Sequence, residues 1–199
     1  MLKAENIGHF YQSGQWLFRG LSFAVEKGQW LGIQGRSGSG KTTLGGFLSG
    51  FESPVEGVVT LHDRPVISSV GNQPSVVQYL FQHPETAMNP LWKMSRIINE
   101  GAEVPESLLA QFGINPEWLS RYPHQLSGGQ LARLALVRAL AVQPDYIIAD
   151  ELTASLDAIN QANLWCALRQ YAQQQEMAVL VISHNHVLLE HLCQRVITI

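Results

Sequence analysis

One short segment, residues 35–42, limits more strongly than any other feature what this chain can fold into. It reads Gly-Arg-Ser-Gly-Ser-Gly-Lys-Thr and matches the pattern G-x-x-x-x-G-K-[S/T]. The apolar run Trp30–Gln34 before it is typical of a buried strand, and Lys41–Ser49 after it is typical of a helix that ends at Gly50. This order of strand, glycine-rich loop and helix predicts a phosphate-binding loop.

The chemistry of phosphate binding explains the residue types in this loop. Glycines let the backbone wrap until successive N–H groups point at phosphate oxygens, and the following helix adds the positive end of its dipole. Lys41 brings a positive charge to the β- and γ-phosphates of a nucleotide, and Thr42 offers a hydroxyl to Mg²⁺. The alternative is a glycine-rich turn with a chance lysine. The residues predicted to contact the nucleotide are Gly35, Arg36, Ser37, Gly38, Ser39, Gly40, Lys41, Thr42 and Thr43.

Two acidic residues follow a second apolar run, Tyr146–Ala149. An acid at the end of a strand beside a phosphate loop can hold Mg²⁺ directly or through water, and a neighbouring acid can act as a base on the attacking water. We therefore expect Asp150 in a magnesium site and Glu151 as the catalytic base. Taken alone the pair is a weak signal, because exposed strand ends are often acidic.

Short apolar runs alternate with helix-like segments, which favours an α/β fold with a mainly parallel sheet covered on both faces. Residues 84–125 lack a strand pattern and read as a helical insertion. We therefore expect a single domain over 1–199, with a core of residues 1–83 and 126–199 and a helical subdomain of about 84–125. Further strands are predicted at Leu21–Val25, Gly57–Leu61, Val76–Phe81, Met177–Ile182 and Val196–Ile199, and helices at Gly128–Val142, Ile159–Gln174 and before Cys193.

Composition disfavours several classes of protein. A chain of 199 residues that is 46% hydrophobic and 15% charged can bury a core, unlike a disordered tail. Its net charge of −3 disfavours nucleic-acid binding through a broad basic face. No apolar run approaches the ~18 residues that cross a bilayer, and the N-terminus lacks the apolar core of a signal peptide. Cys166 and Cys193 fit no disulfide framework, and we expect both as small core residues.

A second glycine pair stands at another predicted helix start, in Leu-Ser-Gly-Gly-Gln at 126–130. Ser127 is a suitable N-cap, and Gly128 and Gly129 leave backbone N–H groups free for another anion. The alternative is a simple capped helix. With this segment the sequence resembles the ATP-binding cassette (ABC) ATPases, whose signature is LSGGQ. The resemblance runs from Tyr11 to Ile199, and the motifs occur in the order of the family.

The resemblance implies a P-loop ATPase fold of the ABC type, with a mainly parallel sheet core, an antiparallel β part and a helical insertion. It implies that Tyr11 stacks on adenine, that Gln82 reaches Mg²⁺ and the attacking water, and that His184 contacts the γ-phosphate and orients that water. The resemblance also implies that Asp157, which ends Ala-Ser-Leu-Asp at 154–157, is a nucleotide-binding residue in a loop that crosses a dimer interface. A core tyrosine and a solvent-facing glutamine are the alternatives for Tyr11 and Gln82.

The resemblance also implies ligands and partners. ATP and Mg²⁺ are the expected ligands, and ATP hydrolysis is the expected activity. Two cassettes of this family pair head to tail, so that each ATP lies between the phosphate loop of one subunit and residues equivalent to Ser127, Gly128, Gly129 and Gln130 of the other. The expected partners are a second ABC ATPase subunit, integral membrane permease subunits and, indirectly, an extracytoplasmic substrate-binding protein, but no nucleic acid. The implied location is peripheral, on the cytoplasmic face of the inner membrane.

Residues 81–90, Phe-Gln-His-Pro-Glu-Thr-Ala-Met-Asn-Pro, resemble a segment of ATPase subunits from bacterial peptide and nickel importers. This implies uptake of peptides, nickel or a metal chelate. The alternative is a soluble ABC ATPase acting in nucleic-acid repair or translation, although such proteins usually have two cassettes or a long coiled-coil insertion. Leu152 and Asn185 stand where the family usually has proline and aspartate, which leaves open the rigidity of the crossing loop and the orientation of His184.

Overall fold

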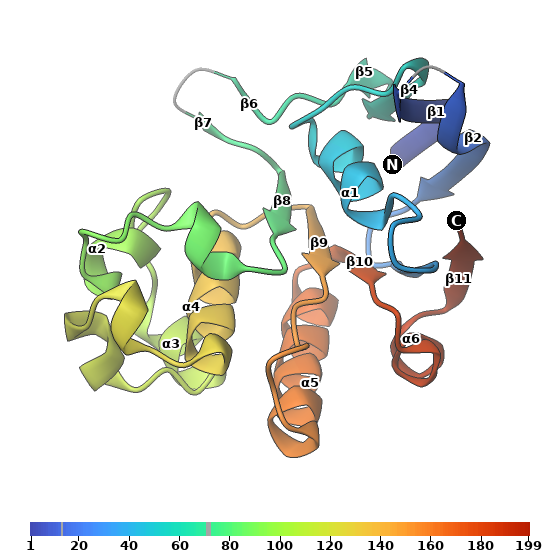
Figure 1. Cartoon of the computed structure of the whole chain (residues 1–199). Coiled ribbons are helices and arrows are strands. Elements are labelled where there is room, and N and C mark those ends of the chain that lie inside the picture. The colour runs from blue at the N-terminus through green and yellow to red at the C-terminus, as the bar shows by residue number, and fades with distance from the viewer. Residues whose placement is uncertain (13, 71–72) are drawn as a thin grey trace.

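The computed structural model describes residues 1–12, 14–70 and 73–199, and its elements are labelled in Figure 1. The strands are β1 Leu2–Gln12, β2 Gln15–Val25, β3 Trp30–Gln34, β4 Glu56–Leu61, β5 Arg64–Pro65, β6 Ser69–Val70, β7 Gln73–Pro74, β8 Val77–Leu80, β9 Tyr146–Asp150, β10 Ala178–Ile182 and β11 Arg195–Thr198. The α-helices are α1 Lys41–Ser49, α2 Met94–Ile98, α3 Glu106–Gln111, α4 Gly128–Ala141, α5 Ala158–Gln174 and α6 His186–Leu192. Three short 3₁₀ helices are η1 Pro84–Ala87, η2 Pro116–Ser120 and η3 Pro123–Gln125.

A parallel sheet with the strand order β11-β3-β10-β9-β8 forms the centre of the molecule. Every residue of β9 and β10 is buried. Strands that are apolar throughout are stable only where both faces of a sheet are covered. The parallel sheet predicted from the apolar runs is therefore present.

Alternate residues of the central strands pack against different layers. Ile148 and Leu180 belong to a core that contains α1 and the strands β1 and β4. Ile147 and Val179 face the opposite core, which contains residues of α4, α5 and α6. Figure 1 shows α1 on the same side as β1 and β4, and α5 and α6 on the other. One face of the sheet is thus covered by helices and the other by α1 together with a second sheet.

This second sheet is antiparallel, with the order β2-β1-β4-β5. The predicted strand Leu21–Val25 is only the last part of β2, and β1 was not predicted from the sequence. Most residues of β2 are exposed or half-buried. The apolar run Leu21–Val25 is therefore too short to predict the full length of β2.

Residues 84–125 contain only helices and turns within this described segment, as the sequence predicts. Met94 and Ile97 of α2 are almost fully buried in the core that also contains α4. Arg138 on α4 donates to the carbonyl of Ala87 at 2.7 Å, which ties η1 to that helix. The division into a core and a helical subdomain remains our proposal.

The prediction that both cysteines are core residues is wrong for Cys166, which is exposed. The buried stripe of α5 contains Leu164 and Leu168, and Cys166 lies off that stripe. Cys193 is half-buried, and burial raises the pKa of its thiol to about 12.

Candidate nucleotide-binding site

The loop between β3 and α1 has a backbone shape that depends on glycine. Gly38 and Gly40 have φ angles of 81° and 93°, which L side chains adopt only with strain. A Cβ atom at Gly40 would lie 2.9 Å from Cε1 of Phe18. The N–H of Ser39 donates to the carbonyl of Arg36 at 3.1 Å and closes a turn. The two glycines and this turn therefore fix the shape of the loop backbone.

Lys41, the first residue of α1, folds its side chain back over this loop. Its Nζ donates to the carbonyl of Gly35 at 2.9 Å and to that of Arg36 at 3.0 Å. The ammonium group has three donors, so it can hold these carbonyls and still contact an anion. Its charge lies beside the N-terminus of α1, where the helix dipole also favours negative charge.

A cleft of about 390 Å³ lies over the loop and gathers side chains from motifs that are far apart in the sequence. Its size is within the range of small-molecule sites. Gly35, Arg36 and Ser39, which were also predicted, are not part of its lining. The lining consists of Tyr11, Leu17, Ser37, Gly38, Gly40, Lys41, Thr42, Thr43, Gln82, Asp150, Glu151 and His184, and of these only Leu17 was not predicted.

Asp150 ends β9 and is only 1% exposed. Its Oδ2 accepts a hydrogen bond from the hydroxyl of Thr42 at 2.7 Å and another from the hydroxyl of Tyr79 at 2.7 Å. Burial and the adjacent carboxylate raise the pKa of Tyr79, so its hydroxyl stays protonated and remains a donor. Sequence reasoning missed Tyr79, because a tyrosine within an apolar strand reads as a packing residue.

The residues at this corner of the cleft fit a magnesium ion that arrives with a nucleotide. They offer only oxygen near the loop: the Thr42 hydroxyl and the Asp150 carboxylate, with Gln82 and Glu151 in the same lining. Mg²⁺ prefers such ligands, and commonly takes one or two carboxylates, phosphate oxygens and several waters. No group of three or more His, Cys, Asp or Glu residues that could cage a metal occurs within residues 1–12, 14–70 and 73–199. Phosphate oxygens and waters would therefore complete the site.

Glu151 follows β9 with a φ angle of 49°, and its side chain is directed to the end of β10. Its Oε1 accepts the backbone N–H of His184 at 2.9 Å and lies 2.8 Å from Nδ1 of the same residue. The hydroxyl of Ser183 donates to Oε2 at 3.4 Å. Asn185 instead caps α6 by accepting the N–H of Leu188 at 3.1 Å. Glu151 therefore orients the His184 ring. Asn185 serves as the N-cap of α6 instead.

Tyr11 and Gln82 both reach the cleft from its rim. Tyr11 is 67% exposed, which excludes the alternative of a core tyrosine, and its hydroxyl lies 2.8 Å from Oγ1 of Thr43. Its ring meets that of His9 edge-on, with 4.9 Å between the ring centroids. Gln82 is exposed and lies two residues beyond the end of β8. Both residues are exposed in the lining of the cleft, where a ligand can reach them.

The second predicted anion site lies at the start of α4. The hydroxyl of Ser127 accepts the N–H of Gln130 at 3.3 Å, and Oε1 of Gln130 accepts the N–H of Ser127 at 2.9 Å, which forms a capping box. Ser127 and Gly128 are exposed, and N–H groups in a first helical turn have no acceptor within the helix. These residues are absent from the described lining of the cleft. One chain therefore keeps its two predicted anion sites apart.

The two glycines at this helix start pack against the loop 151–157. A Cβ atom at Gly128 would lie 3.1 Å from Oγ of Ser155, and one at Gly129 would collide with the side chain of Leu156. The start of α4 and the loop that follows Glu151 are thus in direct contact, and glycine is required for their close approach.

Asp157, at the end of the same loop, is the N-cap of α5. It accepts the N–H of Asn160 at 2.9 Å and that of Ile159 at 3.1 Å. The hydrogen bonds from Asn160 lower the pKa of Asp157. Its predicted contact with a nucleotide is not made in this chain's own cleft, whose described lining does not include it.

Thr153 anchors the loop 151–157. In this loop Leu152 stands where the ABC ATPases usually have proline. The Thr153 hydroxyl accepts hydrogen bonds from Nε2 of Gln161 at 2.8 Å and from Nε1 of Trp165 at 3.2 Å. Leu152 and Thr153 are 5% and 4% exposed. Two buried residues therefore hold the loop to α5 without a proline, a contact that sequence reasoning missed.

Comparison with known proteins decides the family. The family model described as ABC transporter matches residues 18–154, which is more than half of the chain. The chain belongs to the ABC transporter family. The expected ABC-type fold and ATP-binding cassette are confirmed by this match and by the parallel sheet, phosphate loop and antiparallel sheet described above.

Curated relatives of this ABC cassette include import proteins. It is 32% identical to a nickel import ATP-binding protein, NikE, of Pseudomonas putida, over 99% of the chain and 81% of the relative. It is 32% identical to a di/tripeptide transport ATP-binding protein, DppF, of Pseudomonas aeruginosa, over 99% of the chain and 69% of the relative. It also matches a putative peptide import ATP-binding protein of Brucella ovis at 32% identity, over 90% of the chain and only 62% of that relative.

Solved structures show the same fold. The dimeric structure of a post-hydrolysis state of the ATP-binding cassette MJ0796, bound to ADP and Pi, superimposes with a TM-score of 0.85 over 100% of this chain and 94% of that one, at 23% identity. The cbiO1 structure from Clostridium perfringens gives a TM-score of 0.81 over 99% and 83% of the two chains, at 22% identity. Within the described part of this cassette, none of the helices has the length and apolarity that crossing a membrane requires.

Proposed function

We propose that this cassette is the ATP-binding and ATP-hydrolysing subunit of an importer for peptides, nickel or a metal chelate. The observation that carries the proposal is the single cleft in which the loop lysine, a buried aspartate and a glutamate–histidine pair meet. The import relatives at 32% identity support the choice of transport over nucleic-acid repair or translation.

Each residue of the cleft has a distinct part in the proposed reaction. The loop N–H groups and Lys41 bind the phosphates, and the exposed ring of Tyr11 packs on the base. Thr42 and Asp150, with Gln82 nearby, would hold Mg²⁺, which when bound would neutralise charge on the β- and γ-phosphates. Glu151 accepts the proton of the attacking water, and His184, oriented by Glu151, contacts the γ-phosphate and orients that water.

A second copy or a paralogue completes the site in this proposal. Ser127 and Gly128 are exposed at a helix start that also contains Gly129 and Gln130 and is separate from the cleft of the same chain. A nucleotide with several negative charges can be held between the phosphate loop of one subunit and this helix start of another. Loss of the γ-phosphate removes part of that attraction, so hydrolysis would separate the subunits.

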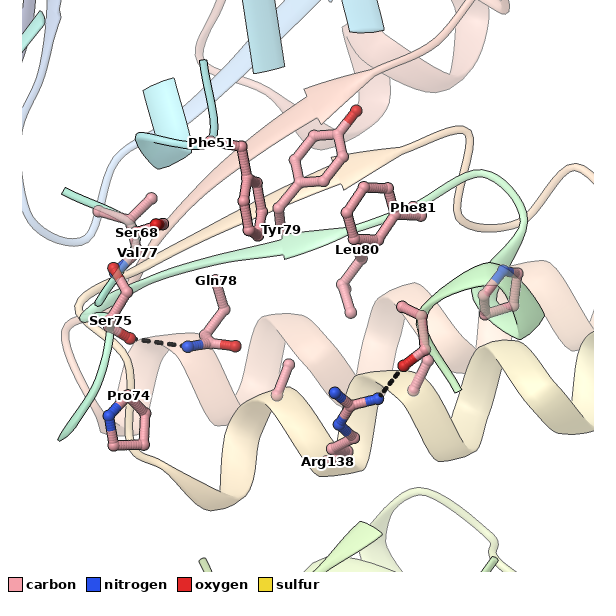
Figure 2. Close-up of a pocket in the computed structure, with 14 residues that line it drawn as sticks. Phe51, Ser68, Pro74, Ser75, Val77, Gln78, Tyr79, Leu80, Phe81 and Arg138 are labelled. Carbon is pink, nitrogen blue, oxygen red and sulfur yellow. Dashed lines mark hydrogen bonds between the residues drawn. The ribbon is translucent and has the colours of Figure 1, made fainter. Parts of the chain in front are cut away.

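A groove of about 230 Å³ between β8, η1 and α4 is the surface that we assign to the membrane permease (Figure 2). Phe51, which is 57% exposed, and Phe81 form an aromatic part, and Gln78 and Arg138 add polar groups. Gln82 directly follows Phe81, so the groove adjoins the cleft along the chain. A permease segment in this groove would place the cassette at the cytoplasmic face of the inner membrane. A substrate-binding protein on the extracytoplasmic side of the membrane would deliver the cargo to the permease.

The proposed hydrolysis is tested with Glu151→Gln. This change removes the proton acceptor and keeps the side-chain shape, so phosphate release should fall by at least about a hundredfold while ATP affinity, measured by calorimetry, stays close to that of the wild type. The matched control is Glu190→Gln, because Glu190 is exposed on α6 and pairs with His186 away from the cleft. A Glu151→Gln protein that releases phosphate at the wild-type rate would contradict the role of Glu151.

The transported cargo is identified by measuring uptake in cells of the organism that carries this gene. Cells that lack the gene should lose uptake of either labelled nickel or a labelled dipeptide, and the gene on a plasmid should restore it. Restoration should fail with the Glu151→Gln gene. Normal uptake of nickel, nickel chelates and peptides by the deletion strain would reject the importer assignment.

A further inference from the structure

Tyr79 is a buried hydroxyl-bearing residue that the reaction proposed above does not use. It lies on β8, is 9% exposed, and donates to Oδ2 of Asp150 at 2.7 Å. A Cβ atom at Gly45 of α1 would lie 2.5 Å from Cε2 of Tyr79. The ring therefore reaches the carboxylate only because α1 has glycine at this position.

Neighbouring aromatic rings fix the direction of this side chain. The ring centroid of Tyr79 lies 4.6 Å from that of Phe81, with the planes nearly perpendicular, and 6.3 Å from that of Phe51. Figure 2 shows the hydroxyl of Tyr79 pointing away from Gln78 and Arg138 in the groove. Edge-to-face contacts of this kind restrict rotation of a ring. The hydroxyl is thus presented to Asp150 in one orientation.

The hydrogen bonds of Asp150 show why this hydroxyl matters. Among the described residues its carboxylate accepts from Thr42 and Tyr79, in both cases at Oδ2. The Thr42 hydroxyl could give an oxygen lone pair to a magnesium ion and still donate its proton to the carboxylate, and Tyr79 is the other side-chain donor. A carboxylate that is 1% exposed therefore relies on Tyr79 for one of its two described side-chain donors, since buried charges with too few hydrogen bonds are costly.

We propose that Tyr79 is a positioning residue of the magnesium site: its hydroxyl holds the Asp150 carboxylate in the orientation that receives the ion. This role rests on the proposed function, because it concerns the binding of nucleotide together with Mg²⁺. Tyr79 itself touches neither nucleotide nor ion, and Gly45 supports it by leaving room for its ring.

The test is calorimetric binding of the β,γ-imido analogue of ATP, which is not hydrolysed, first in EDTA and then across a MgCl₂ series. For Tyr79→Phe, the Mg²⁺ concentration that gives half of the affinity gain should rise about tenfold, the usual scale of one hydrogen bond to a charged group. Affinity in EDTA should stay within about twofold, because the phosphate loop is intact. A structural effect alone would lower the melting temperature without moving the Mg²⁺ midpoint.

Two further variants separate positioning from stability. Tyr146→Phe removes another buried hydroxyl, which donates to the carbonyl of Val25 at 3.4 Å, and should leave the Mg²⁺ midpoint unchanged. Gly45→Ala pushes on the Tyr79 ring and should raise the midpoint as Tyr79→Phe does. In the Tyr79→Phe background, Gly45→Ala should add little to that rise, because the hydroxyl is already gone.

The outcomes distinguish this proposal from the proposed function. A wild-type protein that binds the analogue equally weakly with and without Mg²⁺ would reject the nucleotide site and the role of Tyr79 together. A wild-type protein that gains affinity with Mg²⁺, alongside a Tyr79→Phe protein with the same midpoint, would reject the role of Tyr79 alone. A midpoint moved equally by Tyr146→Phe would also reject it.

Discussion

Lys41 shows how much of the site is ready before a ligand binds. Its ammonium is already held across the loop by the carbonyls of Gly35 and Arg36. A phosphate group would meet a charge that is in place beside the N-terminus of α1. Binding then requires little reordering of a long flexible side chain, which otherwise reduces affinity.

We expect Lys41→Ala to lower ATP affinity by more than about tenfold, because one charged hydrogen-bond donor to phosphate is lost. Calorimetry with ATP and EDTA measures this without hydrolysis. Lys27→Ala is the control: Lys27 is paired with Asp145 at 2.6 Å and lies outside the described lining of the cleft. Equal ATP affinity of the Lys41→Ala and wild-type proteins would contradict the assignment of the phosphate loop.

Among the elements, the loop 151–157 connects the most parts of the site. It begins with Glu151, contacts the glycines that open α4, and ends at the N-cap of α5. The buried hydroxyl of Thr153 joins the loop to Gln161 and Trp165 of α5. The position of Glu151 therefore depends on side chains from a helix that does not line the cleft.

Thr153→Val keeps the shape of the side chain but leaves the half-buried Gln161 amide and the buried Trp165 indole N–H without this acceptor. The free energy of unfolding should fall by about 1–3 kcal/mol, and phosphate release should fall more than ATP affinity. Urea denaturation at 25 °C measures the first effect. Thr198→Val removes a comparable bond, from Nε2 of Gln34 at 2.7 Å, at an exposed site, and should cost less. A loss for Thr153→Val no larger than that of Thr198→Val would show that the loop is held by other contacts.

Some elements could be predicted from the sequence and others could not, depending on how strongly burial and backbone geometry restrict the residue types. The strand Tyr146–Ala149 and the loop at 35–42 were predicted because burial on both faces and tight backbone wrapping leave strong local patterns. The strand β1 was missed, and only the end of β2 was found, because that sheet is partly exposed. Tyr79 was missed because its partner, Asp150, is distant in sequence, and only the fold brings their oxygens together.

At the scale of the whole molecule, the separation of the two predicted anion sites is the feature that governs assembly. Ser127 and Gly128 face solvent, whereas the cleft contains Lys41 and Asp150. Since a single chain does not bring them together, a nucleotide can contact both only if two chains meet. The monomer is therefore an incomplete catalyst in our proposal.

Glu151→Gln protein with ATP and Mg²⁺ should elute from a sizing column as a dimer, because the nucleotide is retained between two copies. Without ATP, or with ADP, it should elute as a monomer. The double variant Lys41→Ala/Glu151→Gln should stay monomeric with ATP, since the first site no longer binds. An ATP-loaded Glu151→Gln protein that remains monomeric at high concentration would contradict pairing between copies of this chain.

The aromatic rings beside β8 connect two surfaces that face different partners. Phe51 is exposed at the groove, and it packs near the ring whose other end holds Asp150. A membrane-protein side chain resting on Phe51 would change the surroundings of that ring directly. Communication between transport and energy release would then need a shift of a few side chains, and the central sheet could remain rigid throughout the cycle.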